Sequence, residues 1–173
     1  VENTSWSCYH GVERWKSDCG CNTGGNEGWD QTWRGPLRDT FDWVRENLIT
    51  LYENELQQYT SDPWGVRDKY IHVILNRDQE NVNNFLKENF SENLSDEEKV
   101  KLLKLMEMQY HAMLMYTSCG WFFDEVTGIE TMQDILYAAR ALQLAETISG
   151  HSYEGTFMQL LEQAESNKKE YKN

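Results

Sequence analysis

From residue 37 onward, apolar residues recur at intervals of three and four, the spacing that places side chains on one face of an α-helix. We find neither the alternating pattern of a β-strand nor an internal repeat. The sequence therefore predicts an all-α fold in which residues 37–173 form a bundle of five to six helices. The expected helices cover about 36–59, 63–75, a short stretch from 78, 95–117, 131–150 and 153–167.

Residues with strong positional preferences support these boundaries. Pro36 occupies a first helical position, where its missing N–H is not needed. Ser95 with Glu98 three residues later is the pattern of a capping box. Gly150 is placed to end the helix that precedes it.

The first 36 residues show no helical or strand periodicity. They hold three of the four cysteines and four of the seven tryptophans, together with several glycines and few aliphatic side chains. Such a segment cannot build a core of its own, so we expect it to pack on one end of the bundle. A chain of 173 residues is a single domain by length.

The charge of the chain limits its partners. Its 29 acidic and 16 basic side chains give a net charge of -13. Binding to a nucleic acid or to an anionic membrane requires a basic surface, so we expect neither partner. No apolar run approaches the ~20 residues of a membrane span, and no signal-peptide pattern is present. We expect a cytoplasmic location and, since the sequence begins at Val1, a piece of a larger enzyme.

The cysteines fall in two stretches. Cys8, Cys19 and Cys21 belong to the N-terminal segment, and Cys119 follows the fourth predicted helix. We expect the two stretches to meet, so that the four thiolates form a tetrahedral zinc site with His10 as an alternative ligand. An iron–sulfur cluster is the less favoured cofactor. A structural zinc ion would supply ordering energy on the order of 10 kcal/mol, as it does in small peptides.

Two alternatives to a metal stay open from the residues alone. A disulfide between Cys8 and Cys19 is compatible with their spacing, whereas one between Cys19 and Cys21 would close a strained ring. The thiols could also be unliganded, with Cys119 as a small buried residue at a helix end. Clustered cysteines in a chain without export signals more often indicate metal or redox chemistry than structural disulfides.

Large aromatic side chains gather in the same two stretches. Indole rings stack on the apolar faces of sugars, and charged neighbours can hydrogen-bond sugar hydroxyls. The alternative is that a tryptophan near the end of a bundle fills a gap in the packing. We expect carbohydrate contacts from Trp6, Trp29, Trp33, Arg34, Trp121 and Asp124.

Several of these motifs resemble a known family. The most specific are Thr-Ser-Trp-Ser-Cys at 4–8, Asp-Cys-Gly-Cys at 18–21, and Met-Tyr-Thr-Ser-Cys-Gly-Trp-Phe-Phe-Asp at 115–124. Shorter matches lie at 10–12, 14–15, 29–34, 128–130 and 137–141. The chain resembles the C-terminal domain of unknown function that follows the catalytic barrel in a subset of family 57 glycoside hydrolases, proteins often labelled α-amylase or α-mannosidase-like.

This resemblance implies a partner and a role. The catalytic barrel of the same polypeptide would lie N-terminal to the chain, and the substrate would be an α-glucan or a related oligosaccharide. The catalytic carboxylates of that family belong to the barrel, so we expect no catalytic residue here. The first hypothesis is a non-catalytic accessory domain that contributes aromatic residues to carbohydrate binding and is stabilised by its cysteine cluster. The alternative is a metal-binding or redox module whose function resides at the cysteines.

Overall fold

The computed structural model describes residues 2–171, and the predicted all-α class is confirmed. Within these residues the regular elements are helices, and the one β-type contact is an isolated bridge. Three short 3-10 helices accompany the α-helices: η1 (Glu13–Trp15), η2 (Ser118–Trp121) and η3 (Lys169–Tyr171). The α-helices are α1 (Arg34–Leu56), α2 (Pro63–Lys69), α3 (Ile71–Leu75), α4 (Gln79–Asn89), α5 (Asp96–Leu114), α6 (Ile129–Ser149) and α7 (Glu154–Leu161).

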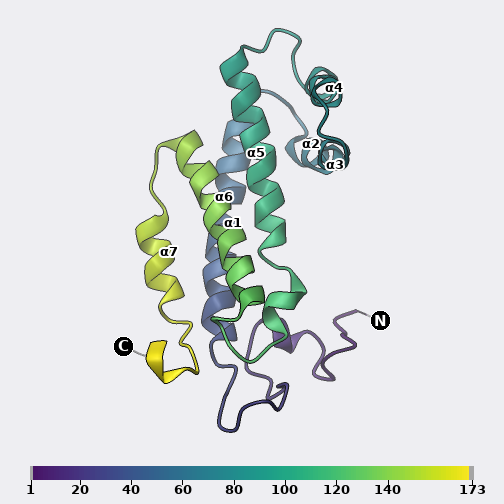
Figure 1. Cartoon of the computed structure of the whole chain (residues 1–173). Helices are drawn as coiled ribbons and strands as arrows, with labels where there is room; N and C mark the ends of the chain where they lie inside the picture. The colour runs from purple at the N-terminus through teal and green to yellow at the C-terminus, as the bar shows by residue number, and fades with distance from the viewer. Residues whose placement is uncertain (1, 172–173) are drawn as a thin grey trace.

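Three long helices, α1, α5 and α6, run side by side and form the centre of the bundle (Figure 1). Helix α7 packs on α1, and α2 also contacts α1. The short helices α2 to α4 form a group beside α5, away from α7 (Figure 1). No helix among residues 2–171 has the length and apolar character needed to cross a bilayer.

Helix α1 supplies the central stripe of the core. Its apolar residues at helical spacing are all almost completely buried, as the sequence pattern predicts. They are Leu37, Phe41, Val44, Leu48, Tyr52 and Leu56.

Two predicted boundary signals are confirmed, one is wrong, and two predicted helices differ. Helix α1 begins at Arg34, so Pro36 is its third residue and not its first. Ser95 and Glu98 form the capping box at the start of α5, and Gly150 ends α6 with φ +70°. The helix expected over 63–75 is interrupted at Tyr70, whose N–H is shared between two carbonyls of the preceding turn. The last bundle helix ends at Leu161 and not near 167, because the chain beyond it is hydrogen-bonded to another loop.

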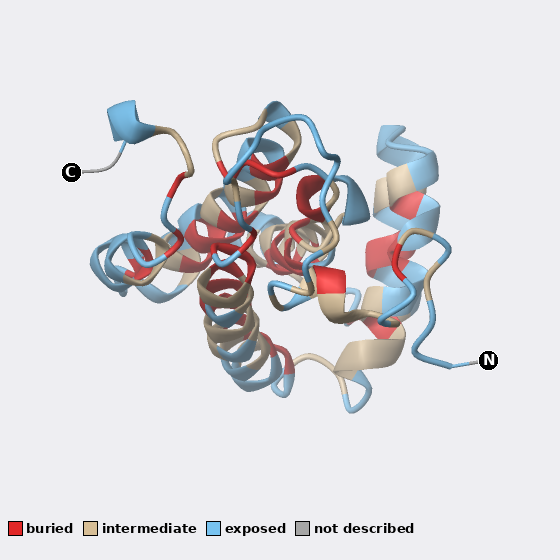
Figure 2. Ribbon diagram, turned by 90° about the horizontal axis from the view of Figure 1, so that it is seen from below, coloured by how far each residue is buried: buried red, intermediate tan, exposed pale blue. Residues whose placement is uncertain are grey.

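The N-terminal segment crosses one end of the bundle, as expected. Viewed from that end, it runs over the helix ends as mostly exposed or intermediate chain (Figure 2). The start of α1 and the start of α6 lie at the same end (Figure 1). Loops from both halves of the sequence therefore surround this end, and the candidate site lies among them.

Candidate metal centre

Four potential ligands come together in the N-terminal segment: Cys8, His10, Cys19 and Cys21. Their ligand atoms all lie within 4.8 Å of one another. The sulfur of Cys8 is 3.7 Å from the sulfurs of Cys19 and Cys21 and 3.7 Å from Nδ1 of His10. The same ring nitrogen lies 3.4 Å from the sulfur of Cys21. All four cysteines of the chain are free thiols, so this group could hold one metal ion.

The backbone reaches this arrangement through two sharp turns. Gly20, with φ +76°, separates the last two cysteines, and its N–H donates a 2.9 Å hydrogen bond to the Asp18 carboxylate. Gly11 follows the histidine with φ +76°, and a Cβ there would lie only 2.6 Å from the Asn3 carbonyl oxygen. Residue 11 therefore has to be glycine, because its φ is positive and because a side chain would collide with the Asn3 backbone.

The ligands differ in exposure and in their tendency to ionise. Cys8 is buried, Cys19 and Cys21 are intermediate, and His10 is exposed. Burial opposes ionisation of Cys8, but hydrogen bonds with His10 and with the other two thiols lower the pKa of Cys8 to about 7. Burial, reinforced by the neighbouring thiols, raises the pKa of Cys21. Since the thiolate is the form that binds metal, the lowered pKa of Cys8 favours metal binding by this thiol.

Cys119 does not belong to this group, and His10 occupies the fourth place that we expected Cys119 to fill. Cys119 lies in η2 with its side chain exposed. The expected meeting of the two stretches does take place, but residues after Cys119 make it. The thiol is therefore not needed to join them.

The contacts between the two stretches are polar and aromatic. The carboxylate of Asp124 accepts hydrogen bonds from the backbone N–H of Thr23, at 2.9 and 3.0 Å, and from its hydroxyl. The ring of Trp6 stacks on Phe122 with a centroid separation of 6.3 Å, and the guanidinium of Arg14 lies 4.9 Å from the same ring. These contacts hold the cysteine-bearing segment against the loop between α5 and α6.

Four of the six residues expected to contact carbohydrate are buried: Trp33, Arg34, Trp121 and Asp124. Trp33 and Trp121 stack on each other with ring centroids 6.2 Å apart. Arg34 donates hydrogen bonds to the backbone carbonyls of Cys21 and Phe123. Such side chains cannot stack on a sugar at the surface, so we withdraw these four from the expected contacts. They belong to the packed interior at this end of the bundle, and Arg34 joins it to the candidate metal centre through the Cys21 carbonyl.

The other two expected carbohydrate residues remain accessible. Trp6 is 93% exposed, and Trp29 is of intermediate burial. Both belong to the N-terminal segment. Of the six expected residues, Trp6 and Trp29 are therefore the two whose side chains can contact a sugar at the surface.

Two neighbouring carboxylates have a structural role that sequence reasoning missed. Asp124 holds the N-terminal segment, whereas Glu125 holds the chain after α7. Glu125 accepts hydrogen bonds from the hydroxyl of Ser166 at 2.6 Å and from the N–H of Asn167 at 3.0 Å. Burial would raise the pKa of Glu125, but these and other hydrogen bonds lower it. The partners are far apart in sequence and match no motif, so no sequence signal identified them.

Two buried cations lie close to the metal centre. Arg14 and Arg34 are both almost fully buried. Burial, and then the charge of Arg14, lowers the pKa of Arg34, whereas the charges of Cys19 and Asp124 act in the opposite direction. Arg34 also donates a hydrogen bond to the backbone carbonyl of Cys21, so this cation is joined directly to the cysteine-bearing segment.

Comparison with known families gives one match. Residues 29–173 match a family described as a domain of unknown function, DUF3536. The chain belongs to this family. No curated protein and no solved structure matches it. The match begins after Cys21, so the four residues of the metal centre precede the part of the chain that the DUF3536 match covers.

Proposed function

We propose that this DUF3536 chain is a non-catalytic domain that binds one structural zinc ion through Cys8, His10, Cys19 and Cys21. The observation that supports zinc most directly is the spacing of the ligand atoms. Zn–S bonds of about 2.3 Å and Zn–N bonds of about 2.0–2.1 Å in a tetrahedron separate the ligand atoms by about 3.5–3.8 Å. The separations of 3.4 and 3.7 Å agree with that geometry.

The donor set favours a single closed ion over a cluster or a catalytic metal. Iron–sulfur clusters are usually held by four cysteines that bind different irons, and this group has three cysteines and a histidine. Four protein ligands also complete a tetrahedral zinc shell and leave no position for substrate, as in structural sites. Zinc with three thiolates and a neutral imidazole carries one net negative charge. The nearby guanidiniums of Arg14 and Arg34 offset it.

The purified chain is expected to contain about one zinc ion per molecule, because the four ligand atoms all lie within 4.8 Å of one another. Elemental analysis after gel filtration measures this ratio. Cys21→Ser should lose the zinc, and Cys119→Ser should retain it, since Cys119 lies outside the group. Iron with a visible charge-transfer band, or a wild-type chain free of metal after refolding with zinc, would contradict the proposal.

We also propose an accessory role in α-glucan binding, which rests on the resemblance to the domain that follows the family 57 glycoside hydrolase barrel. The supporting observation is an exposed aromatic surface at the metal-centre end. Trp6 presents most of its indole to solvent while lying against Phe122, and Tyr9 and Phe123 are also exposed. Aromatic faces of this kind stack on pyranose rings. The catalytic barrel would be the other part of this proposed assembly.

Titration with maltoheptaose should shift the indole resonance of Trp6 in the NMR spectrum of the zinc-loaded chain. Trp6→Ala is expected to weaken the affinity by about tenfold, which corresponds to about 1.4 kcal/mol, because the stacking face is lost. Tyr171→Ala removes another exposed aromatic ring and serves as the control. Equal effects of the two substitutions, or an unchanged Trp6 resonance at saturating sugar, would count against this role.

A further inference from the structure

A second candidate site lies between α1, α2 and α5, apart from the metal centre. It is a hollow of about 340 Å³ with three arginines in its lining: Arg38 and Arg45 from α1, and Arg67 from α2. Apolar side chains from α1 and α5 also line it, namely Ile49, Ala112 and Met113. We infer that this hollow binds a small organic phosphate, with the phosphate on the arginines and an apolar or ring-shaped body on Ile49 and Met113.

The concentration of positive charge is unusual for this chain. The sequence has a net charge of -13 and seven arginines, three of which line this one hollow. Arg38 and Arg45 are seven residues apart and therefore lie on one face of α1. A strongly acidic protein repels anions in general, so a local cluster of guanidiniums is where an anion can bind.

The acidic partners of the three arginines are Asp42, Glu46 and Asp68, and none of them lines the hollow. Arg38 donates to both oxygens of Asp42, at 3.0 and 3.1 Å, and Arg45 lies 3.1 Å from one of the same oxygens. The hydroxyl of Tyr116 donates to that oxygen as well, at 2.6 Å. One carboxylate is therefore shared by two guanidiniums and a phenol.

The remaining ion pairs are weak. Arg67 is paired with its sequence neighbour Asp68, and Arg45 lies 3.9 Å from Glu46, and both acidic side chains are mostly exposed. Exposed ion pairs of this kind contribute little free energy to the stability of the fold. The lining of the hollow therefore presents three guanidiniums and no carboxylate, a donor set suited to the charge of roughly -1.5 to -2 that a phosphate monoester carries at neutral pH.

The guanidiniums are held in place yet remain accessible. Those of Arg38 and Arg45 lie 5.0 and 5.9 Å from the ring centre of Tyr116, and that of Arg67 lies 5.0 Å from the ring of Trp64. Each arginine side chain nevertheless keeps 30–39% of its surface exposed. Planar donors fixed before binding suit the tetrahedral oxygens of phosphate and lose little entropy on binding.

The apolar part of the lining indicates that the ligand is more than an inorganic ion. Met113 is 51% exposed although it is apolar, and it lies beside the buried Ala112 at the end of α5. An inorganic phosphate would leave this surface in contact with water. An attached apolar or ring-shaped body would cover it and gain binding free energy from the burial.

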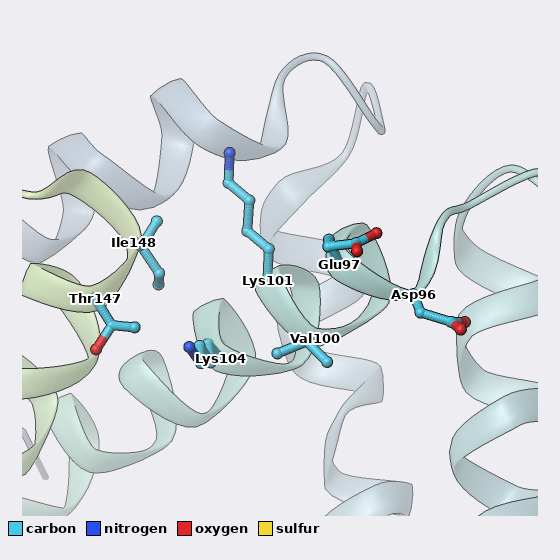
Figure 3. A pocket seen from close by; sticks show the side chains of 7 residues that line it. All are labelled: Asp96, Glu97, Val100, Lys101, Lys104, Thr147 and Ile148. Atoms are coloured by element: carbon cyan, nitrogen blue, oxygen red, sulfur yellow. The ribbon is translucent and has the colours of Figure 1, made fainter.

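The hollow in Figure 3 provides a contrast within the same molecule. It lies between the start of α5 and the end of α6, and lysines and acidic residues line it together. Lys101 is already paired with Glu55 at 2.5 Å, and the lining also contains the carboxylates of Asp96 and Glu97 (Figure 3). Its charges balance, so it offers no comparable site for a dianion.

Phenyl phosphate and inorganic phosphate are the probes for this inference, titrated separately into the zinc-loaded chain at low ionic strength and followed by calorimetry and NMR. We expect saturable binding of phenyl phosphate with shifts at Arg45, Arg67 and Met113. Inorganic phosphate should bind more weakly. Arg45→Gln combined with Arg67→Gln should weaken phenyl phosphate binding by about tenfold or more, since two charge-assisted contacts are lost.

Lys101→Gln combined with Lys104→Gln likewise removes two positive charges, in this case from the hollow of Figure 3, and is the matched control. Circular dichroism verifies that the variants are folded. An equal loss of affinity in the lysine variant would show nonspecific attraction and overturn the inference. Equal affinity for the two phosphates, or no saturable binding of phenyl phosphate, would overturn it as well.

Discussion

Replacing Cys8 with serine is expected to unfold residues 8–21 locally while the helices stay folded. Cys8 is the one buried ligand, and its sulfur is 3.7 Å from each of the other three ligand atoms. Val12 is the only aliphatic residue between residues 2 and 33, so little apolar burial can replace the metal. Structural zinc contributes on the order of 10 kcal/mol to folding in small peptides, and most of that should be lost.

Hydrogen exchange followed by mass spectrometry measures this local unfolding. Amides of residues 8–21 should lose their protection in Cys8→Ser, whereas those of α1, α5 and α6 keep it. Cys119→Ser is the control that removes a thiol without removing a ligand. Adding a chelator to the wild-type chain should reproduce the Cys8→Ser pattern. Unchanged protection of the segment in Cys8→Ser would refute a metal-dependent fold.

The helices were predictable because their pattern is local. The stripe of α1 is fully buried, and the signals at Ser95 and Gly150 act within one helical turn. The end of α7 was not predictable in this way. It depends on hydrogen bonds from Ser166 and Asn167 to Glu125 in a distant loop, which no local propensity encodes.

Cys8, Cys19, Cys21 and the alternative ligand His10 come together in one group, whereas Cys119, the expected fourth ligand, lies outside it. The sequence shows that Cys119 lies in a cysteine- and tryptophan-rich loop, but it does not show on which side of η2 the thiol lies. His10 is close in sequence to the three cysteines of the group, so closing the site costs less chain entropy than recruiting a distant ligand. Proximity in sequence was the signal that favoured His10.

The tryptophans illustrate a different limit. Trp6 and Trp33 are the same residue type in the same irregular segment, yet one is almost fully exposed and the other is buried against Trp121. Tryptophan is used both in cores and at binding surfaces, so its presence alone does not distinguish the two. The arginine hollow was also not predicted, since its three arginines come together only when α1 and α2 pack.

Asp134 is expected to make the folded chain less stable as the pH rises from about 4 to 7. Its carboxyl is 2% exposed, it packs against Gly120, and its Oδ2 has no hydrogen-bond partner among residues 2–171. Burial raises the pKa of Asp134 from 3.8 to about 7. Between these two values the folded state holds a proton that the unfolded state has released. The free energy of unfolding should therefore fall by about 1.4 kcal/mol per pH unit.

Asp134→Asn keeps the shape of the side chain and removes its titration. Other carboxyls, such as Glu125, have a lowered pKa and lose stability when the pH falls, so the wild-type curve alone combines opposite effects. The difference in unfolding free energy between Asp134→Asn and wild type isolates Asp134. Measured by urea denaturation, it should grow in favour of the variant by about 3 kcal/mol between pH 4 and pH 7, because each titration is only partly complete at these limits. Glu97→Gln, at an exposed position on α5, should keep the wild-type pH dependence. A difference for Asp134→Asn that stays constant with pH would mean that the buried carboxyl ionises as easily in the folded chain as in the unfolded one.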